Sequence, residues 1–227
     1  MRILASLLLA LALTLPAHAD DPQALVDRSR LAVENVLKDP NFASAKARLR
    51  NARGILVFPQ LIKAGLVIGG EGGLGVLLSR DAQGRWSEPA FVTLAGASFG
   101  FQIGVEAKEV LFIVVTDKGM NSLLSAQAKL GADASISVGP VGAGVEASTT
   151  GSPATDIVAF SKSQGLFGGA ALEGSVIQPK ADFNQAYYGR AVSPKQILVD
   201  RAVGNPGADA LRAALAARDR KSTRLNS

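Results

Sequence analysis

Four basic residues, Lys46, Arg48, Arg50 and Arg53, stand close together in the sequence, and no acidic residue lies among them. Guanidinium and ammonium groups gathered in this way bind phosphates and anionic lipid headgroups. The alternative is a solvated helix face whose cations lie near the C-terminus of the helix. Lys63, ten residues after Arg53, completes the set of cations that we predict to contact lipid.

Most catalytic groups are missing from the chain. It has no cysteine, and its single histidine is His18, within the first 19 residues. After residue 19, no Ser-His-Asp triad, Cys-His dyad or His-ligated or thiolate-ligated metal site can therefore be formed. Only Ser/Lys pairs and paired carboxylates are left for an enzyme. We therefore expect no catalytic residue, no metal and no cofactor.

A carboxylate-based hydrolase is the least favoured of the functions considered. The acidic residues examined for this role are Glu71, Glu106, Asp133 and Glu173. They stand on separate predicted segments, and no spacing pairs them as a glycosidase would require.

The first 19 residues have the pattern of a secretory signal peptide: Arg2, an apolar run over residues 3–15, and a small-residue site ending at Ala19. A run of this length is too short to cross a bilayer as a helix. A bacterial lipoprotein would need a cysteine at the cleavage point, and the chain contains none. We expect cleavage near Ala19 and a soluble, exported protein of the bacterial periplasm.

The rest of the chain is predicted to form one domain over residues 20–217, followed by a disordered or non-native tail over residues 218–227. Of the net charge of +5, Arg2 supplies one unit and the tail supplies three. The body of the protein is thus close to neutral. Because a nucleic-acid binder ordinarily has a basic domain, we expect no nucleic-acid partner.

An amphipathic helix is predicted from Pro22 to about Lys38, where apolar residues recur at helical spacing. Leu25, Val33 and Val36 belong to this apolar stripe. Two interpretations are open: the stripe inserts into a membrane beside the basic residues, or it covers a sheet as part of the core. A second helical stretch, residues 42–51, carries the basic residues.

Alternation of apolar and small residues over 96–107, followed by the fully apolar run 110–115, predicts two consecutive strands. Lys108 and Glu109 are expected to form the turn between them. A further strand over 54–59 is expected to stop at Pro59, and a helix is expected over 118–130. The predicted fold is an α+β domain with a strongly curved, up to barrel-like, antiparallel sheet of glycine-rich strands, flanked by N-terminal and C-terminal helices.

Several sequence blocks together resemble the SYLF domain family over about Val26 to Val199. They are Gly54-Ile-Leu-Val-Phe-Pro59, Lys63-Ala-Gly65, Ile68-Gly-Gly70, Ser98-Phe-Gly100, Gln102-Ile-Gly104, Leu130-Gly-Ala-Asp133, Gly139-Pro-Val-Gly142, Ser161-Lys-Ser-Gln-Gly-Leu-Phe167, Leu172-Glu-Gly174 and Tyr187-Tyr-Gly189. The resemblance implies a lipid-binding module, because eukaryotic members look like phosphoinositide binders that use an amphipathic N-terminal helix and basic residues. Some fungal members bind actin.

For an exported bacterial member, only binding to anionic phospholipid carries over from this resemblance. The predicted function is therefore non-enzymatic binding of phospholipid, or of a membrane surface, in the cell envelope. The alternative is an envelope structural or protein-interaction module with an unknown envelope partner.

Overall fold

The computed structural model describes residues 21–65, 68–99, 104–139, 141, 155–162 and 172–216. The predicted signal peptide and the predicted tail lie outside these residues, as do parts of several sequence blocks named above.

In the described part of the chain, eight strands form one sheet in the order β5-β8-β3-β2-β1-β4-β7-β6. Neighbouring strands are antiparallel, except that β6 and β7 are parallel. The strands are β1 (Gly54–Gly65), β2 (Ile68–Ser79), β3 (Ala90–Phe99), β4 (Gly104–Val114), β5 (Ala128–Lys129), β6 (Ile136–Val138), β7 (Ile157–Lys162) and β8 (Val176–Pro179).

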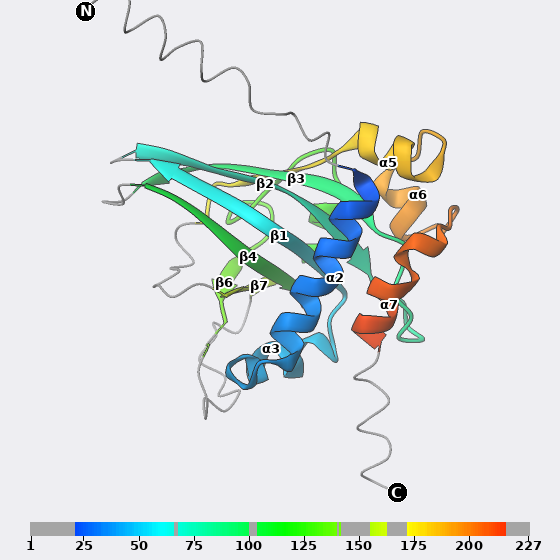
Figure 1. Ribbon diagram of the computed structural model, residues 1–227, viewed down its shortest axis with the longest axis horizontal. Helices are drawn as coiled ribbons and strands as arrows, with labels where there is room; N and C mark the ends of the chain where they lie inside the picture. Colours follow the sequence, from blue (N-terminus) through cyan, green and yellow to red (C-terminus); the bar gives the residue numbers. More distant parts are fainter. Residues whose placement is uncertain are drawn as a thin grey trace, which may run out of the picture.

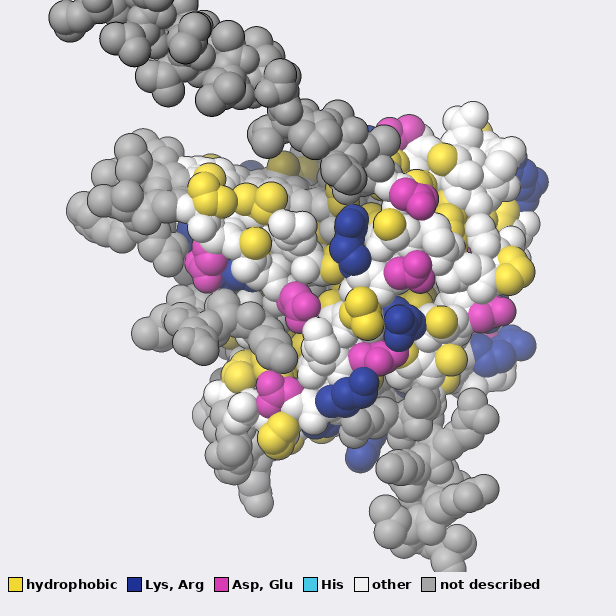
Figure 2. All heavy atoms as spheres, in the orientation of Figure 1, with side chains coloured by type: hydrophobic (Ala, Val, Ile, Leu, Met, Phe, Trp, Pro, Cys, Tyr) yellow, Lys and Arg dark blue, Asp and Glu magenta, His cyan; other side chains and the backbone are white. Residues whose placement is uncertain are grey.

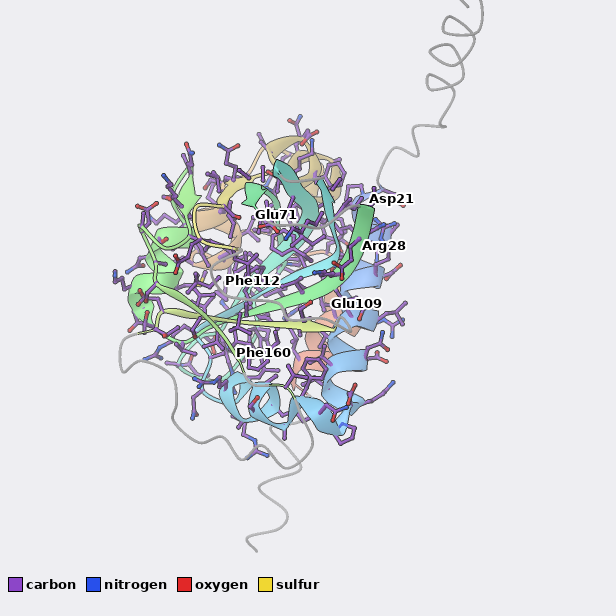
Figure 3. The ribbon with its side chains drawn as sticks, turned by 90° about the vertical axis from the view of Figure 1, so that its left-hand side faces the viewer. Asp21, Arg28, Glu71, Glu109, Phe112 and Phe160 are labelled. Carbon is purple, nitrogen blue, oxygen red and sulfur yellow. The ribbon has the colours of Figure 1, made fainter. Side chains whose placement is uncertain are left out.

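The sheet curls into a half-barrel, as the sequence predicted. Its two edge strands, β5 and β6, are joined by only six residues, 130–135. A flat sheet of this size would separate its edges by about 34 Å, whereas seven residue steps span at most about 25 Å. The sheet must therefore bend to bring its edges together. Figure 3 shows the half-barrel from the side where β1 and β3 end and β2 and β4 begin, which we call the free strand ends. Phe112 and Glu71 lie inside the curl.

Helices flank the sheet at both ends of the chain. They are α2 (Pro22–Lys38), α3 (Ala43–Leu49), α4 (Asp117–Leu123), α5 (Ala181–Tyr188), α6 (Pro194–Leu198) and α7 (Asp209–Ala216). Helix α2 starts where the Asp21 side chain accepts a hydrogen bond from the backbone N–H of Gln23, with Pro22 in the first turn. It crosses the outer face of the sheet, and the strands extend well beyond it (Figure 1).

Two apolar cores lie on opposite faces of the sheet. The outer core joins α2, α5 and α7 to strand residues such as Val57 and Leu111. The inner core fills the half-barrel, where the rings of Phe58 and Phe112 meet edge to face with centroids 5.6 Å apart. Strands covered on both faces are apolar at consecutive positions, which explains the run at the end of β4.

Three details of the predicted fold were wrong. Lys108 and Glu109 do not form a turn, because β4 continues through them and β3 and β4 are separated in the sheet by β2 and β1. Pro59 does not end β1, because it lies in a β-bulge between Val57 and Gln60. A bulge leaves a residue outside the ladder, so the missing N–H of proline is tolerated there.

The third error concerns the helix predicted over residues 118–130. Helix α4 ends at Leu123, and Ala128–Lys129 form β5 instead. Pairing with β8 provides hydrogen-bond partners for the backbone of these two residues. Because β8 is distant in the sequence, local helical spacing does not reveal this pairing.

None of the described helices is both long enough and apolar enough to span a membrane.

Candidate functional site

Five of the described charged residues line a cleft that lies where β1 begins. The cleft has a volume of about 470 Å³, and we call it the arginine cleft. Its lining includes the charged residues Arg53, Arg80, Asp81, Asp117 and Arg201. It also includes four apolar residues, which we call its apolar floor: Met120, Leu124, Leu198 and Val199.

Arg53 precedes β1 and is fixed by its backbone, which donates to the Val114 carbonyl and accepts from the Arg80 N–H, both at 2.8 Å. Its Nε lies 3.0 Å from Oδ1 of Asp117 in the first turn of α4. Both side chains are more than half exposed. A surface pair of this kind contributes roughly 0–1 kcal/mol, so Arg53 remains available to an incoming anion.

Arg80 is held by the hairpin that follows β2. Its guanidinium lies over the Trp86 ring, 5.7 Å from the centroid, and donates to the backbone carbonyls of Gly84 and Arg50. These contacts place Arg50, which follows α3, beside the cleft. Both carbonyl groups accept hydrogen bonds and thereby hold the guanidinium in place.

Arg201 reaches the same hairpin from the segment after α6. Among the residues that the structure describes, Arg201 is the one non-glycine residue with a positive φ angle, +50°. Its guanidinium donates to the carbonyls of Arg85 and Trp86, at 3.0 and 3.3 Å, and lies 3.5 Å from Asp81. A strained backbone that aims a charged side chain into a cleft is typical of binding sites.

Asp81 is shared by two of these arginines. Burial acts to raise its pKa, but hydrogen bonds from Arg85 and the nearby charge of Arg201 hold the pKa below its ordinary value. Among the described residues, the cleft lining has three arginines, Arg53, Arg80 and Arg201, and two paired aspartates, Asp81 and Asp117; Arg85 and the backbone of Arg50 lie at its border. This excess of positive charge over an apolar floor favours a ligand with an anionic head and an apolar body.

A buried carboxylate anchors α4, which supplies one wall of the cleft. Asp156 accepts hydrogen bonds from the Thr116 hydroxyl at 2.6 Å and from the backbone and hydroxyl of Ser135 at 2.9 and 2.8 Å. Lys118 lies 3.3 Å away. Burial alone would raise the pKa of Asp156, but these contacts lower it to about 2.

We expect this network to make stability depend on acid pH. Because the folded pKa lies below the unfolded value, the contribution of Asp156 is fully present above about pH 4 and disappears as the pH falls through about 2. At neutral pH, Asp156→Asn should lower the free energy of unfolding by about 2 kcal/mol relative to the unaltered protein.

Urea unfolding of both proteins at neutral pH and at about pH 3 tests this, because about half of the difference should be lost at the lower pH. A difference that does not change with pH would contradict it.

The structure separates the basic residues that the sequence grouped. Arg50 and Arg53 lie at the arginine cleft, whereas Lys46 belongs to α3 and donates to the Asp39 carbonyl at 2.7 Å. Arg48, also on α3, is half-buried. Lys63 lies ten residues further along β1, roughly 30 Å from Arg53. Lipid contact by these residues stays a prediction.

The three apolar residues of the predicted lipid-binding set are core residues. Val33 and Val36 are fully buried and Leu25 is 1% exposed, all in the outer core between α2 and the sheet. This is the second of the two interpretations of the helix. Insertion of these side chains into a membrane would require α2 to leave the sheet.

Two arginines of the cleft, Arg80 and Arg201, escaped the sequence analysis. Each stands alone in its segment, without a neighbouring cluster. Two features of the sequence could have drawn attention to these arginines: the hairpin turn beside Arg80 and the lack of glycine around Arg201. Neither feature distinguishes a binding site from an ordinary loop.

The acidic residues considered for hydrolysis do not converge. Glu71 and Glu106 lie in one row across the sheet, but Lys63 stands between them. Asp133 accepts a hydrogen bond from the backbone of Lys129, and Glu173 lies in the turn before β8.

Glu71 lies inside the half-barrel near the free strand ends (Figure 3). The Ser175 hydroxyl donates to it at 2.9 Å, and burial raises its pKa against the opposing effects of Ser175, Lys63 and Lys108. Its neighbour Lys108 is also buried and pairs with Glu106 at 2.8 Å.

Comparison with known proteins gives one family and several relatives. The family described as "Ysc84: Las17-binding protein actin regulator" matches residues 95–218. The chain is 35% identical over 166 residues to "Protein YSC84" of Saccharomyces cerevisiae, which covers 72% of this chain and 35% of that protein.

Two further relatives agree with this match. "LAS seventeen-binding protein 3" of Saccharomyces cerevisiae is 34% identical, with 72% of this chain and 36% of that protein covered. "SH3 domain-containing YSC84-like protein 1" of Homo sapiens is 29% identical over 66% of this chain and 44% of that protein. The chain thus spans between about a third and under half of the length of these relatives.

Proposed function

Because this chain belongs to the Ysc84 family, also called the SYLF family, we propose that it is a non-enzymatic binding module that recognises anionic phospholipid at a membrane surface. The observation that supports this proposal is the arginine cleft, where guanidinium groups from distant segments meet over an apolar floor.

The chemistry of the cleft suits a phosphate headgroup. A guanidinium presents N–H groups in a planar fork that matches two phosphate oxygens, and it stays charged at all physiological pH values. Each cation at an anionic surface contributes about 1 kcal/mol. The apolar floor adds contact with the first carbons of a lipid, which a free phosphate ion lacks.

The proposed place of action is the periplasm, after removal of residues 1–19. The sequence pattern at Arg2, the apolar run and Ala19 supports this location.

A second candidate is a protein-interaction module. One relative is named for binding LAS seventeen, and the family is described as a Las17-binding protein and actin regulator, so the family includes members that bind proteins. In this chain, the same cleft would then bind carboxylates of an acidic envelope protein, because carboxylate and phosphate share the geometry that a guanidinium recognises.

The double variant Arg50→Gln/Arg53→Gln tests the lipid proposal. Both side chains are exposed, so the fold should be retained. Loss of two surface cations should weaken binding to vesicles of phosphatidylcholine with phosphatidylglycerol by about 2 kcal/mol, or roughly 30-fold, in a flotation assay. The salt dependence of binding should also become shallower.

A matched control is Lys38→Gln/Arg190→Gln, which removes the same charge from exposed residues outside the cleft lining. It should bind almost as well as the unaltered protein. Equal loss in both double variants would show that net charge alone drives binding, and no loss in either would remove the arginine cleft from the lipid site.

A further inference from the structure

The outer face of the sheet carries an exposed apolar surface beyond the edge of α2. We call it the outer apolar face. It consists of Ile62, Ala64, Ala95, Ala97, Val105 and Ala107, all of them exposed. Ile62 is 43% exposed and Val105 is 77% exposed. Figure 2 shows apolar side chains gathered over the part of β1 and β2 that α2 leaves open.

The strand register brings these residues together. Ile62 pairs with Gly72 on one side and with Ala107 on the other, and Gly72 pairs with Ala95. In the next row, Ala64 pairs with Gly70 and Val105, and Gly70 pairs with Ala97. Paired residues point to the same side, so both rows present only apolar or glycine positions.

The bulge at Pro59 explains why the β1 residues of this face, Ile62 and Ala64, point outward. Before the bulge, Ile55 and Val57 point to the helices, and after it Ile62 and Ala64 take that side. The same bulge turns Lys63 to the inner face, where it pairs with Glu106 of β4 and where Lys108 lies in phase with the inner-core residues Val110 and Phe112. In most sheets the apolar side chains are buried and the charged side chains face solvent. Here this is reversed, because the apolar side chains lie on the exposed outer face and the charged side chains lie inside the half-barrel.

Helix α2 does not close over this face. Two hollows of about 350 Å³ each separate the helix from the strands, and they share Arg28, Pro59 and Gln60. On the α2 side, the exposed residues that line these hollows are Arg28, Leu31 and Asn35, of which Arg28 and Asn35 form a polar border. Figure 3 places Arg28 and Glu109 along this border.

We propose that the outer apolar face enters the hydrocarbon layer of a lipid membrane, with the polar border of α2 at headgroup level. This inference takes its ligand class from the function proposed above but assigns a different surface of the protein. Charged and polar groups that border an apolar surface are typical of proteins lying in a membrane interface.

Fluid hydrocarbon fits this face better than a folded partner does. Protein interfaces concentrate their binding energy in bulky anchors that fill pockets, and most residues of this face are alanine or glycine. Acyl chains conform to a smooth surface without needing a pocket.

The outer apolar face reaches the free strand ends. The register sets Gly65 against Gly69 and Gly104, and Ile68 against Phe99, so the ends of four strands lie together.

The face and the arginine cleft lie at opposite ends of β1, which runs from Gly54 beside the cleft to Gly65. Ten residues of strand separate Arg53 from Lys63, which is roughly 30 Å. One flat bilayer therefore does not engage both surfaces in the same way, and each can be altered without the other.

The test uses the absence of cysteine from the chain, which allows a single engineered thiol to be labelled. An environment-sensitive NBD dye is attached to Val105→Cys, and the same dye on Gln83→Cys, in the hairpin at the cleft end, is the control. With neutral phosphatidylcholine vesicles, the dye at position 105 should shift its emission to the blue and be quenched by brominated acyl chains. The dye at position 83 should show neither effect.

A binding assay with a matched pair of variants accompanies the dye. Ile62→Asp/Val105→Asp should weaken binding to phosphatidylcholine vesicles by about tenfold or more and leave the melting temperature unchanged. Val141→Asp is the control, since Val141 is 46% exposed, belongs to neither the outer apolar face nor the lining of the arginine cleft, and undergoes the same change. It should bind neutral vesicles like the unaltered protein.

The outcomes separate this inference from the proposed function. If the dye at position 105 stays unchanged with vesicles of either charge, the outer apolar face is not a membrane surface, whatever the arginine variants do. If instead Ile62→Asp/Val105→Asp converts a dimer into a monomer in light scattering, the face belongs to a second copy of the chain and the inference is overturned. Unchanged binding by Arg50→Gln/Arg53→Gln concerns only the arginine cleft.

Discussion

Val33→Asp is expected to unfold the domain. Val33 is fully buried between α2 and the sheet, in the outer core. The substitution removes a buried apolar side chain and places a carboxylate among the apolar residues of the outer core. We expect it to lower the free energy of unfolding by roughly 5 kcal/mol or more, which is comparable with the whole stability of many domains. Circular dichroism and urea unfolding would measure the loss.

Leu31→Asp is the matched control, because Leu31 lies on the same helix and is 48% exposed. It should change the free energy of unfolding by less than about 1 kcal/mol. A folded Val33→Asp protein that no longer binds vesicles would overturn this expectation, and it would return α2 to the role of a membrane-inserting helix.

Gly75→Ala should destabilise the sheet strongly for a single methyl group. Gly75 lies on β2 opposite the bulge of β1, and the Phe58 ring packs over it. A Cβ at this position would lie 2.6 Å from both the Val57 carbonyl oxygen and a carbon of the Phe58 ring. Because moving the backbone to relieve this contact costs energy, we expect the free energy of unfolding to fall by about 3 kcal/mol.

Gly70→Ala serves as the control on the same strand. There, the nearest heavy atom to an added Cβ is the Gly96 carbonyl oxygen at 3.7 Å, an ordinary contact. Removing a glycine from a strand restricts the unfolded chain, so this variant should be neutral or slightly stabilised. Thermal melts of the two variants side by side would measure the difference, and equal melting temperatures would refute the close packing at Gly75.

Local chemistry determined many helix ends without help from the rest of the fold. Asp21 caps α2, Ser193 forms a capping box for α6, and Asn205 caps the turn that leads into α7, each followed by proline. Gly189 ends α5 in the left-handed conformation, at φ +69°. These signals depend on residues within one turn of each other, so the sequence contains all of them.

Strand boundaries depended on partners that the sequence does not display. The two strands predicted over 96–115 divide after Phe99, because β3 pairs with β2 and β8 whereas β4 pairs with β1 and β7. Likewise, Ala128 and Lys129 form a strand and not the predicted helix, because they pair with β8. Pairing energy comes from residues far apart in the chain, and local propensity cannot anticipate it.

By itself, the sequence determined the α+β class, the curved sheet, the apolar stripe of α2 and the basic character of residues 46–53. Only the tertiary structure decided which surfaces these patterns serve. Period-two alternation divides a strand into two faces but does not say which face is covered, and here Val105 and Ala107 are exposed while Lys108 is buried. In the same way, Arg53 becomes part of a cleft only because folding brings Arg80 and Arg201 beside it. Charge and alternation are properties of neighbouring residues, whereas burial and convergence depend on elements that are distant in the chain.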